Sequence, residues 1–160
     1  MDNSYLLAQD SLRGTAGKAF MVVDGQNIEL FGLKKFESNA EIQTGDFKVV
    51  GANVTQTKVN GIKYTGTATV YYGTPAFLKI LQEYKRTGRF PTINFQVEND
   101  DKGSSIGAQI IAIYSVILTK IPLAILDDSV ESLQEEISFT HTDFEVLKWF
   151  NDAPEQLGGN

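Results

Sequence analysis

The fold is decided by the stretch Gly61-Ile-Lys-Tyr-Thr-Gly-Thr-Ala-Thr-Val-Tyr-Tyr72. From Tyr64 to Tyr72 the side chains alternate with a period of two. One set is Tyr64, Gly66, Ala68, Val70 and Tyr72, and the other is Thr65, Thr67, Thr69 and Tyr71. Successive side chains of an extended chain point to opposite faces, and threonine and tyrosine favour that conformation. The stretch therefore predicts a β-strand over residues 64–72.

A helix of about residues 74–87 is predicted directly after this strand. Thr74 can cap its first turn, and Pro75 suits the first helical position because its missing N–H needs no partner there. The apolar residues recur at helical spacing and form one stripe: Phe77, Ile80, Leu81 and Tyr84. Gly88 supplies a left-handed stop. We expect the stripe to lie against a sheet.

Further structure is predicted on the N-terminal side of this unit. The sequence favours a first strand from Lys18 to Val23. The dipeptide Asp24-Gly25 is a turn signal, and it leads into a second apolar segment from Ile28 to Phe36. Residues 1–17 are polar and contain glycine, so we expect a flexible N-terminal arm there.

Three more strands are predicted on the C-terminal side. The first, Ile93–Val97, alternates apolar and polar residues. Ile106–Leu126 is long enough to span a bilayer, but its many β-branched residues favour a strand buried on both faces over a membrane helix. Residues 136–146 form the last strand. Its apolar residues change phase, which predicts a bulge or bend between Thr140 and Asp143.

Length and composition place these elements in one domain. The chain has 160 residues and is 42% hydrophobic, which suffices for a single core. It has no cysteine, so disulfides and thiolate zinc sites are excluded. Several strands with one helix predict a mainly β fold, an antiparallel β-sandwich or barrel with one flanking helix. We expect this domain at residues 18–150, followed by a C-terminal tail at 151–160.

Residues 43–63 form an unusually long connection for a compact domain, and such connections are often functional. Asn60-Gly61 is a strong hairpin signal, and a two-residue turn there would pair Val59 with Ile62. The same turn would place two lysines opposite each other, Lys58 and Lys63. Four more apolar residues lie in the connection: Phe47, Val49, Val50 and Val54. We expect an extended hairpin arm whose apolar groups are buried on another subunit.

The charges are distributed unevenly along the chain. Residues 1–97 carry 11 basic and 8 acidic residues, whereas residues 98–160 carry 3 basic and 12 acidic residues. We hypothesise that the two lysines of the arm meet acids on a neighbouring copy, within residues 127–136. The candidate acids are Asp127, Asp128 and Glu131. The alternative is ordinary solubility charge and a solvated acidic tail. The net charge of −6 disfavours tight binding of nucleic acid.

Each candidate catalytic or metal-binding motif in the sequence lacks a residue that it requires. His141 is the only histidine, and no Gly-x-Ser-x-Gly motif accompanies it, so we expect a half-exposed structural histidine. An EF-hand register near residues 98–103 places Lys102 where an oxygen ligand belongs. A phosphate-binding loop ending at Gly17-Lys18 lacks its leading glycine and its Ser or Thr. We therefore expect no catalytic residue, metal or cofactor, and no enzyme.

Three segments together resemble a known family. They are Gly61–Tyr72 with the following helix, then Phe90-Pro-Thr-Ile-Asn-Phe-Gln-Val-Glu-Asn-Asp-Asp101, and the acidic ending Ser132-Leu-Gln-Glu-Glu-Ile-Ser-Phe-Thr-His-Thr-Asp-Phe-Glu145. In order and spacing they are similar to the tail tube proteins of contractile-tailed, myovirus-type phages, of PBSX-like defective prophages and of phage-tail-like bacteriocins. The likeness runs from about Gly17 to Glu145.

The resemblance implies a structural virion protein that self-assembles. Hexameric rings would stack into the inner tube of a contractile tail, with subunit sheets joined side by side and residues 43–63 reaching neighbours. DNA would pass through the lumen without specific binding. The implied partners are further copies, the tail sheath, the baseplate and the tail terminator, with no membrane. The protein would be made in the bacterial host cytoplasm. The alternative interpretations are a monomeric small-ligand-binding β-barrel and an enzyme with an unrecognised carboxylate site.

Overall fold

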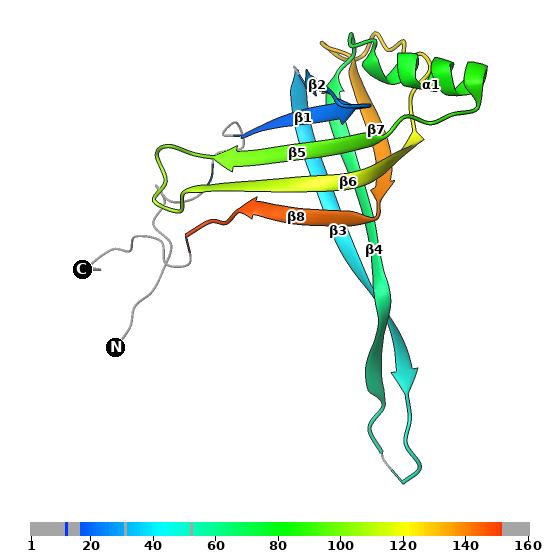
Figure 1. Cartoon of the computed structure of the whole chain (residues 1–160), viewed down its shortest axis with the longest axis vertical. Coiled ribbons are helices and arrows are strands. Elements are labelled where there is room, and N and C mark those ends of the chain that lie inside the picture. Colours follow the sequence, from blue (N-terminus) through cyan, green and yellow to red (C-terminus); the bar gives the residue numbers. More distant parts are fainter. Residues whose placement is uncertain (1–11, 13–16, 31, 52, 152–160) are drawn as a thin grey trace.

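A computed structural model describes residue 12 and residues 17–30, 32–51 and 53–151. The predicted N-terminal arm and C-terminal tail lie almost entirely outside these residues. The elements in chain order are β1 (Gly17–Val23), β2 (Gln26–Glu29), β3 (Leu33–Phe47), β4 (Gln56–Tyr71), α1 (Ala76–Thr87), β5 (Ile93–Asp100), β6 (Ala108–Lys120), β7 (Gln134–His141) and β8 (Asp143–Lys148). The predicted class, a mainly β antiparallel fold with one flanking helix, is confirmed (Figure 1).

The strands form two sheets that share β6. One sheet has the order β2-β1-β5-β6-β8, and the other runs from β6 through β7 and β4 to β3. The strands of the first sheet cross those of the second at a steep angle (Figure 1). The strand β6 pairs with β8 over residues 110–114 and with β7 over residues 117–120. Two crossing sheets of this kind enclose a core between their inner faces.

The prediction that residues 106–126 are a strand buried on both faces is wrong in part. The strand is shorter, and Ile117 on it is 49% exposed. The reason is a bend where the strand changes sheets. Ser115 has a φ of 57°, and its N–H donates to the side-chain oxygen of Asn94 at 3.1 Å. Beyond the bend, β6 has a different partner strand and a different exposed side.

The last predicted strand is two strands, which explains its change of phase. β7 pairs with β4 and β6, whereas β8 pairs only with β6, and the break falls at Thr142. The chain turns a corner there and passes from the second sheet into the first. The predicted bend between Thr140 and Asp143 is therefore confirmed as a corner between sheets.

Aromatic rings from both sheets fill the centre of the core. Phe36 lies 5.3 Å from Phe95 and 5.5 Å from Phe139, measured between ring centroids. Phe95 and Phe139 are 5.1 Å apart and almost completely buried. Gly66 is required beside them, because a Cβ there would lie 2.5 Å from the ring of Phe139 and 2.6 Å from the carbonyl oxygen of Glu37.

The helix α1 closes one end of this core. Phe77 is fully buried and Ile80 nearly so, as the apolar stripe predicts, whereas Tyr84 is 46% exposed. The helix begins at Ala76, one residue after Pro75, the predicted first helical residue. Pro75 takes the N-cap position instead, and the helix has no side-chain cap bond. Gly88 ends it with a φ of 74°, as predicted.

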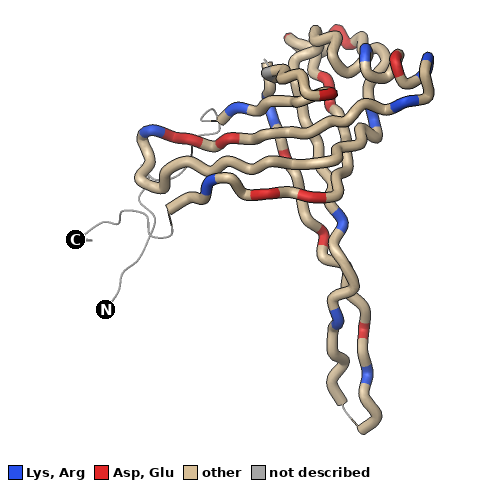
Figure 2. The backbone as a smooth tube through the Cα atoms, in the orientation of Figure 1, with Lys and Arg blue, Asp and Glu red and all other residues tan. Residues whose placement is uncertain are grey.

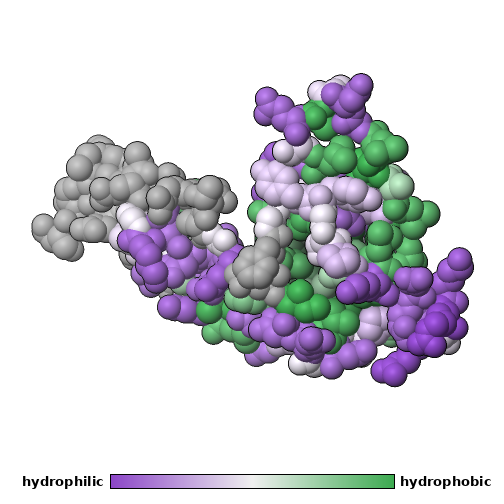
Figure 3. Space-filling view, turned by 90° about the horizontal axis from the view of Figure 1, so that it is seen from above, coloured by the Kyte–Doolittle hydropathy of each residue, from purple (hydrophilic) through white to green (hydrophobic). Residues whose placement is uncertain are grey.

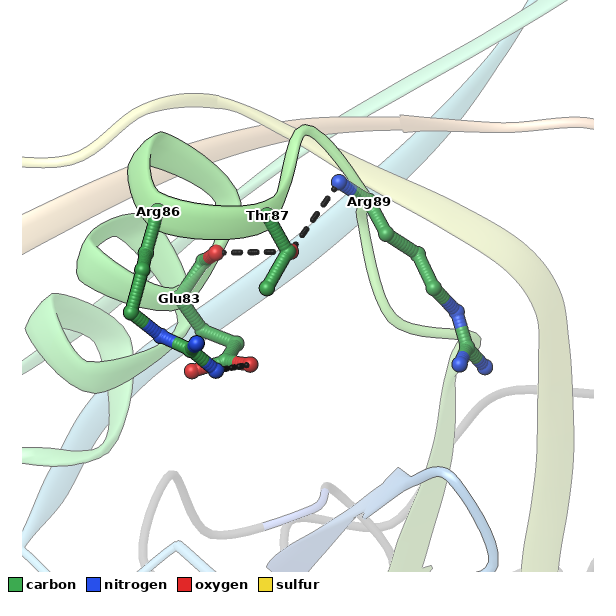
Figure 4. Close-up of polar contacts among 4 residues, drawn as sticks. All are labelled: Glu83, Arg86, Thr87 and Arg89. Atoms are coloured by element: carbon green, nitrogen blue, oxygen red, sulfur yellow. Dashed lines mark hydrogen bonds and ion pairs between the residues drawn. The ribbon is translucent and has the colours of Figure 1, made fainter.

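Surface contacts hold the end of α1. The Arg86 guanidinium lies 2.6 Å from the Glu83 carboxylate, and the Thr87 hydroxyl donates to the Glu83 carbonyl at 2.9 Å (Figure 4). The backbone N–H of Arg89 donates to the same hydroxyl at 3.2 Å. These contacts are exposed and order the turn into β5.

The N-terminal turn forms as predicted, but the segment after it divides. Asp24 and Gly25 both have positive φ, 48° and 84°, and they connect β1 to β2. The apolar segment from Ile28 to Phe36 does not form one strand. β2 ends at Glu29, Gly32 has a φ of 69°, and β3 begins at Leu33. This division moves the chain from the first sheet into the second.

Candidate assembly surfaces

The β3–β4 hairpin projects far beyond the rest of the molecule (Figure 1). β4 pairs with β7 only from Tyr64 onward, through the pair Tyr64↔His141. From there to the turn, β3 and β4 pair only with each other, from Glu41↔Lys63 to Phe47↔Gln56. We call residues 41–51 and 53–63 the arm and the remainder of the described residues the body.

The predicted turn at Asn60-Gly61 is wrong. β4 runs straight through these residues, and Phe47↔Gln56 is instead the last pair before the hairpin turn. Neither residue has the positive φ that a two-residue hairpin turn needs. Asn60 is instead the extra residue of a bulge, since Gln43 pairs with Gly61 and Thr44 with Val59.

The predicted pairing of Lys58 with Lys63 is therefore also wrong. Lys63 lies opposite Glu41, and Lys58 lies opposite Gly45. Opposite charges across an antiparallel pair are favourable, so the pairing of Glu41 with Lys63 stabilises the arm. Both lysines are exposed.

One face of the arm continues the core-facing side of the body. The pairs Phe36↔Ala68 and Ala40↔Tyr64 point between the sheets, and the next pair on that face is Ile42↔Ile62. Ile42 is 61% exposed and Ile62 is 53% exposed. Val59, paired with Thr44, follows on the same face at 63% exposure. The arm thus presents core-type residues to solvent. Ile42 was missed in the sequence, although its alternation with Phe36 identifies it.

The end of the arm is apolar as well. We call residues 47–51, 53 and 54 the tip. Phe47 and Val49 are each about half exposed, Val54 is 73% exposed, and Val50 is completely exposed. Lys48 is the only charged residue of the tip. Exposed apolar residues gathered in this way are typical of a protein interface.

The acids predicted to meet the lysines lie at the other end of the molecule. Asp127, Asp128 and Glu131 belong to the connection between β6 and β7, residues 121–133, which lies beside α1 and opposite the arm (Figure 1). They do not meet Lys58 or Lys63 within one copy. We call residues 121–133 the β6–β7 loop.

The β6–β7 loop combines these acids with exposed apolar side chains. Leu126 is 97% exposed and Leu123 is 69% exposed. Asp127 accepts hydrogen bonds from the N–H and hydroxyl of Ser129 at 2.9 and 2.6 Å, and these bonds lower the pKa of its carboxyl. From above, this end of the molecule shows hydrophobic patches among hydrophilic residues (Figure 3). The sequence indicated the acids but not the leucines.

A hydrogen-bonded histidine lies where the arm leaves the body. His141 is only 7% exposed, so the prediction of a half-exposed side chain is wrong. Its Nε2 lies 2.7 Å from the Ser38 hydroxyl, its Nδ1 lies 3.1 Å from the Asp143 carbonyl, and its ring stacks on Tyr64. Burial lowers its pKa, and the Asp143 carbonyl and charge oppose that shift. The contacts join β3, β4 and the β7–β8 corner, so the histidine has a structural role.

A half-open groove of about 380 Å³ lies beside this histidine. It separates the two sheets, and its lining is mainly apolar: Phe36, Tyr64, Val97, Ile111, Ile113 and Phe144. The groove leads directly onto the apolar face of the arm, because Ala40 and Tyr64 line it and form the pair next to Ile42↔Ile62 on that face. Groove and arm form one continuous surface.

Both sheets end in strands with an unpaired edge among the described residues. These are β2 and β8 in the first sheet and β3 in the second. Leu147 on β8 is 51% exposed, and Trp149 just after β8 is 70% exposed. Free backbone groups along such edges readily pair with another chain.

Glu135 is a buried carboxyl that sequence analysis did not single out. It lies on β7 opposite Val70 and is 2% exposed. Burial raises the pKa of its carboxyl. Alternation along β7 places it on the same inward face as Ile137 and Phe139, which was the available signal.

The described residues include no group of three or more His, Cys, Asp or Glu side chains able to hold a metal ion. Among the same residues, no helix is long and apolar enough to cross a membrane.

Comparison with solved structures identifies the fold. The chain superposes on a chain of the anti-feeding prophage tube-terminating cap with a TM-score of 0.65 and 7% identity, covering 89% of this chain and 95% of the other. For a chain of the anti-feeding prophage baseplate the TM-score is 0.61 at 10% identity, covering 92% of this chain and 97% of the other. For a chain of the native gene transfer agent virion the TM-score is 0.57 at 14% identity, covering 86% of this chain and 100% of the other.

Sequence comparison identifies the family. The family model DUF2001, described as phage tail tube protein, matches residues 4–148. The chain is 33% identical over 148 residues to the phage-like element PBSX protein XkdM of Bacillus subtilis strain 168, covering 92% of this chain and 98% of that protein. It is 35% identical over 152 residues to YqbM of the same strain, covering 95% of this chain and 96% of that protein. The chain therefore belongs to the phage tail tube protein family and is a structural tail component, not an enzyme.

Proposed function

We propose that this protein forms hexameric rings that stack into the inner tube of a contractile phage tail or phage-tail-like particle, with a lumen that conducts DNA. The observation that carries the proposal is the apolar face of the arm. Ile42, Ile62 and Val59 continue a core face, yet more than half of each side chain is exposed in a single copy. A neighbouring subunit that covers this face completes a core that one chain begins.

The unpaired strand edges support assembly into a closed ring. β2 and β8 border the first sheet on opposite sides, so copies placed side by side can continue it from one subunit to the next. A ring satisfies the backbone groups of both edges, whereas an open row leaves two unsatisfied. Ring closure thus removes the feature that makes such edges prone to uncontrolled aggregation.

The outward face of the first sheet is the candidate lining of the lumen. Cross-strand register places Phe20, Gln96, Ala112 and Glu145 in one row of this face. A second row contains Lys18, Glu98, Ile110 and Lys148, with Lys18 and Glu98 3.9 Å apart. Acidic residues recur along β5 and β8 (Figure 2). A lining that mixes acidic, basic, polar and apolar residues, without a basic patch, gives DNA phosphates no attractive site.

The partners proposed are those found around related folds. Solved structures with this fold include a baseplate, a tube-terminating cap and a sheath–tube complex of contractile injection systems. We propose corresponding contacts here with sheath, baseplate and terminator, after synthesis in the host cytoplasm. The alternative of a monomeric ligand-binding barrel requires an enclosed cavity, whereas the apolar groove beside His141 is half open.

Electron microscopy of tail particles from the producing bacterium tests the proposal. An epitope tag would be placed at the C-terminus of the chain, and antibody-labelled particles would be imaged after mild disruption. We expect label on the inner tube, and end views with hexameric symmetry around a lumen. Label confined to another part of the particle, or a tagged chain found only as a free monomer beside complete unlabelled tubes, would refute it.

A further inference from the structure

The groove beside His141 lies next to the point where the chain enters the first strand. β1 begins at Gly17, which pairs with Asn99 on β5, and Asn99 also lines the groove. A further half-open hollow, of about 660 Å³, adjoins the groove. Gly17 lines this hollow, and the hollow shares Phe36, Val97 and Asn99 with the groove. The chain therefore enters the body directly beside the groove.

The groove offers mainly apolar contact and is left incomplete by the rest of the body. Phe144 in its lining is 45% exposed, and Val97 and Ile111 are only partly buried. The Ser38 hydroxyl and the Nε2 atom of His141 lie 2.7 Å apart in its wall and satisfy each other. No segment among the described residues fills the groove. A fitting occupant is therefore a short apolar segment.

The N-terminal segment, residues 1–16, contains one such run. Tyr5-Leu6-Leu7 is the only place in this segment where three aromatic or aliphatic side chains are adjacent. Nine residues, 8–16, connect the run to Gly17. An extended chain of that length spans about 30 Å, so the run reaches a groove that begins beside Gly17. The family match starts at residue 4 and therefore includes the run.

We propose that Tyr5-Leu6-Leu7 docks in the groove of its own chain in the unassembled subunit, and that it leaves the groove when a neighbouring copy covers this surface. The docking concerns the free chain alone, whereas the release rests on the proposed tube. The occupant comes from the same chain because a short tether gives the run a local concentration of about 1 mM at the groove. A run from another chain reaches that value only in concentrated solution.

The docked run holds back assembly. The groove continues into the apolar face of the arm through the pair Ala40↔Tyr64, which is followed on that face by Ile42↔Ile62. A run that fills the groove therefore occupies one end of the surface that a neighbouring copy covers. Exposed apolar surface of this kind promotes uncontrolled association, and the docked run reduces it in the free subunit.

Disulfide trapping in the free chain tests the docking, because the natural chain has no cysteine. Ala40→Cys is a small change at an exposed position of the groove lining, and it is combined with Leu6→Cys. We expect rapid formation of a disulfide within one chain, seen as a faster band when dilute protein is oxidised and run on a non-reducing gel.

The matched control combines Leu6→Cys with Glu41→Cys. Glu41 is exposed and adjoins Ala40, but its side chain lies on the opposite face of β3. The control disulfide should form more slowly by a factor on the order of ten, because docking no longer adds to the tether. Equal rates for the two pairs would overturn the docking. A disulfide that forms only between chains, and faster at higher protein concentration, would overturn its placement in the same chain.

Tube assembly tests the release. Subunits locked by the disulfide between Leu6→Cys and Ala40→Cys should not enter tubes, and a reductant should restore assembly. Wild-type subunits treated with the same oxidant should assemble throughout. Locked subunits that assemble as readily as reduced ones would overturn the release and leave the tube intact. A wild-type chain that forms no tube at all would overturn the proposed function, while trapping in the free chain would still decide the docking.

Discussion

The two halves of the β3–β4 hairpin have the same strands and the same alternation but opposite surroundings. In the body half, Ala68 is 1% exposed and lies opposite Phe36 over the core. In the arm half, Ile42 and Ile62 occupy equivalent places on the same face and are 61% and 53% exposed. One continuous pattern therefore specifies two interfaces. The body half is covered by its own chain, and the arm half is left for another.

The largest expected loss of stability comes from the core that covers the body half of the hairpin. Phe139→Ala removes a ring that contacts Phe36 and Phe95 in the core. We expect the free energy of unfolding to fall by about 3–5 kcal/mol, because the cavity cannot close among three packed rings. Urea denaturation of the unassembled chain measures it. A loss similar to that of an exposed residue would contradict the assignment of the core.

The junction between the halves should show an intermediate effect that depends on pH. His141→Ala removes contacts to Ser38, Asp143 and Tyr64, and we expect a loss of about 1–2 kcal/mol at pH 7.5. Burial holds the pKa of His141 below its ordinary value of 6.5. The unfolded chain therefore binds a proton first as the pH falls below that value, and the wild-type protein loses stability there.

Thermal unfolding across this range measures the pH effect of His141. The variant should lack this part of the pH dependence, so the two stability curves should approach each other as the pH falls. Curves that stay parallel would show that the histidine does not titrate in this way.

Substitution of the buried Glu135 should have a smaller effect on stability at neutral pH, and it should raise stability instead of lowering it. Burial raises the pKa of its carboxyl above the ordinary value of 4.5, so the folded chain holds the proton to higher pH than the unfolded chain does. Stability is therefore lost as the pH rises through the folded pKa. Glu135→Gln should stabilise the protein by about 1 kcal/mol at pH 7, with the gain vanishing below pH 4.5, where the carboxyl is neutral in both states.

The melting temperature at two pH values measures the Glu135 effect. Glu136→Gln is the matched control. Glu136 follows Glu135 on β7 and is exposed, so this substitution should leave the melting temperature unchanged. Destabilisation by Glu135→Gln at pH 7 would mean that the carboxylate has a stabilising partner.

The smallest expected effect on the free chain is in the arm. Ile62→Ala should change the free energy of unfolding by about 0.5 kcal/mol or less, because the side chain has little to lose in a single copy. Ile62→Asp should likewise leave the monomer folded, as judged by circular dichroism, but should prevent tube assembly. A large loss of monomer stability would mean that the arm folds against its own body.

Local patterns predicted the elements better than they predicted their partners. The alternation of Gly66, Ala68 and Val70 and the stop at Gly88 follow from local geometry, and both are found in the structure. The change of sheet at Ser115 and the buried state of His141 depend on strands distant in sequence, so no local pattern indicates them.

The failure at Asn60-Gly61 shows how a strong local preference is overridden. The pair Ile42↔Ile62 and the pairs beyond it hold β4 straight, and the bulge accommodates the extra residue. Gly45 lies close to this bulge. A Cβ at Gly45 would lie 2.8 Å from the side-chain nitrogen of Asn60, which is exposed and would have to move aside. The apolar tip was identifiable from composition. The groove beside His141 was not, since its lining comes from strands that are distant in sequence.

The central claim is that the apolar face of the arm is completed by another copy. A cryo-electron microscopy map of the assembled tube tests it most directly. The account predicts that Ile42, Ile62 and Val59 are buried against the adjacent subunit, with strand edges paired around the ring. A tube in which the arm lies free in solvent, or is folded back on the groove of its own body, would contradict it.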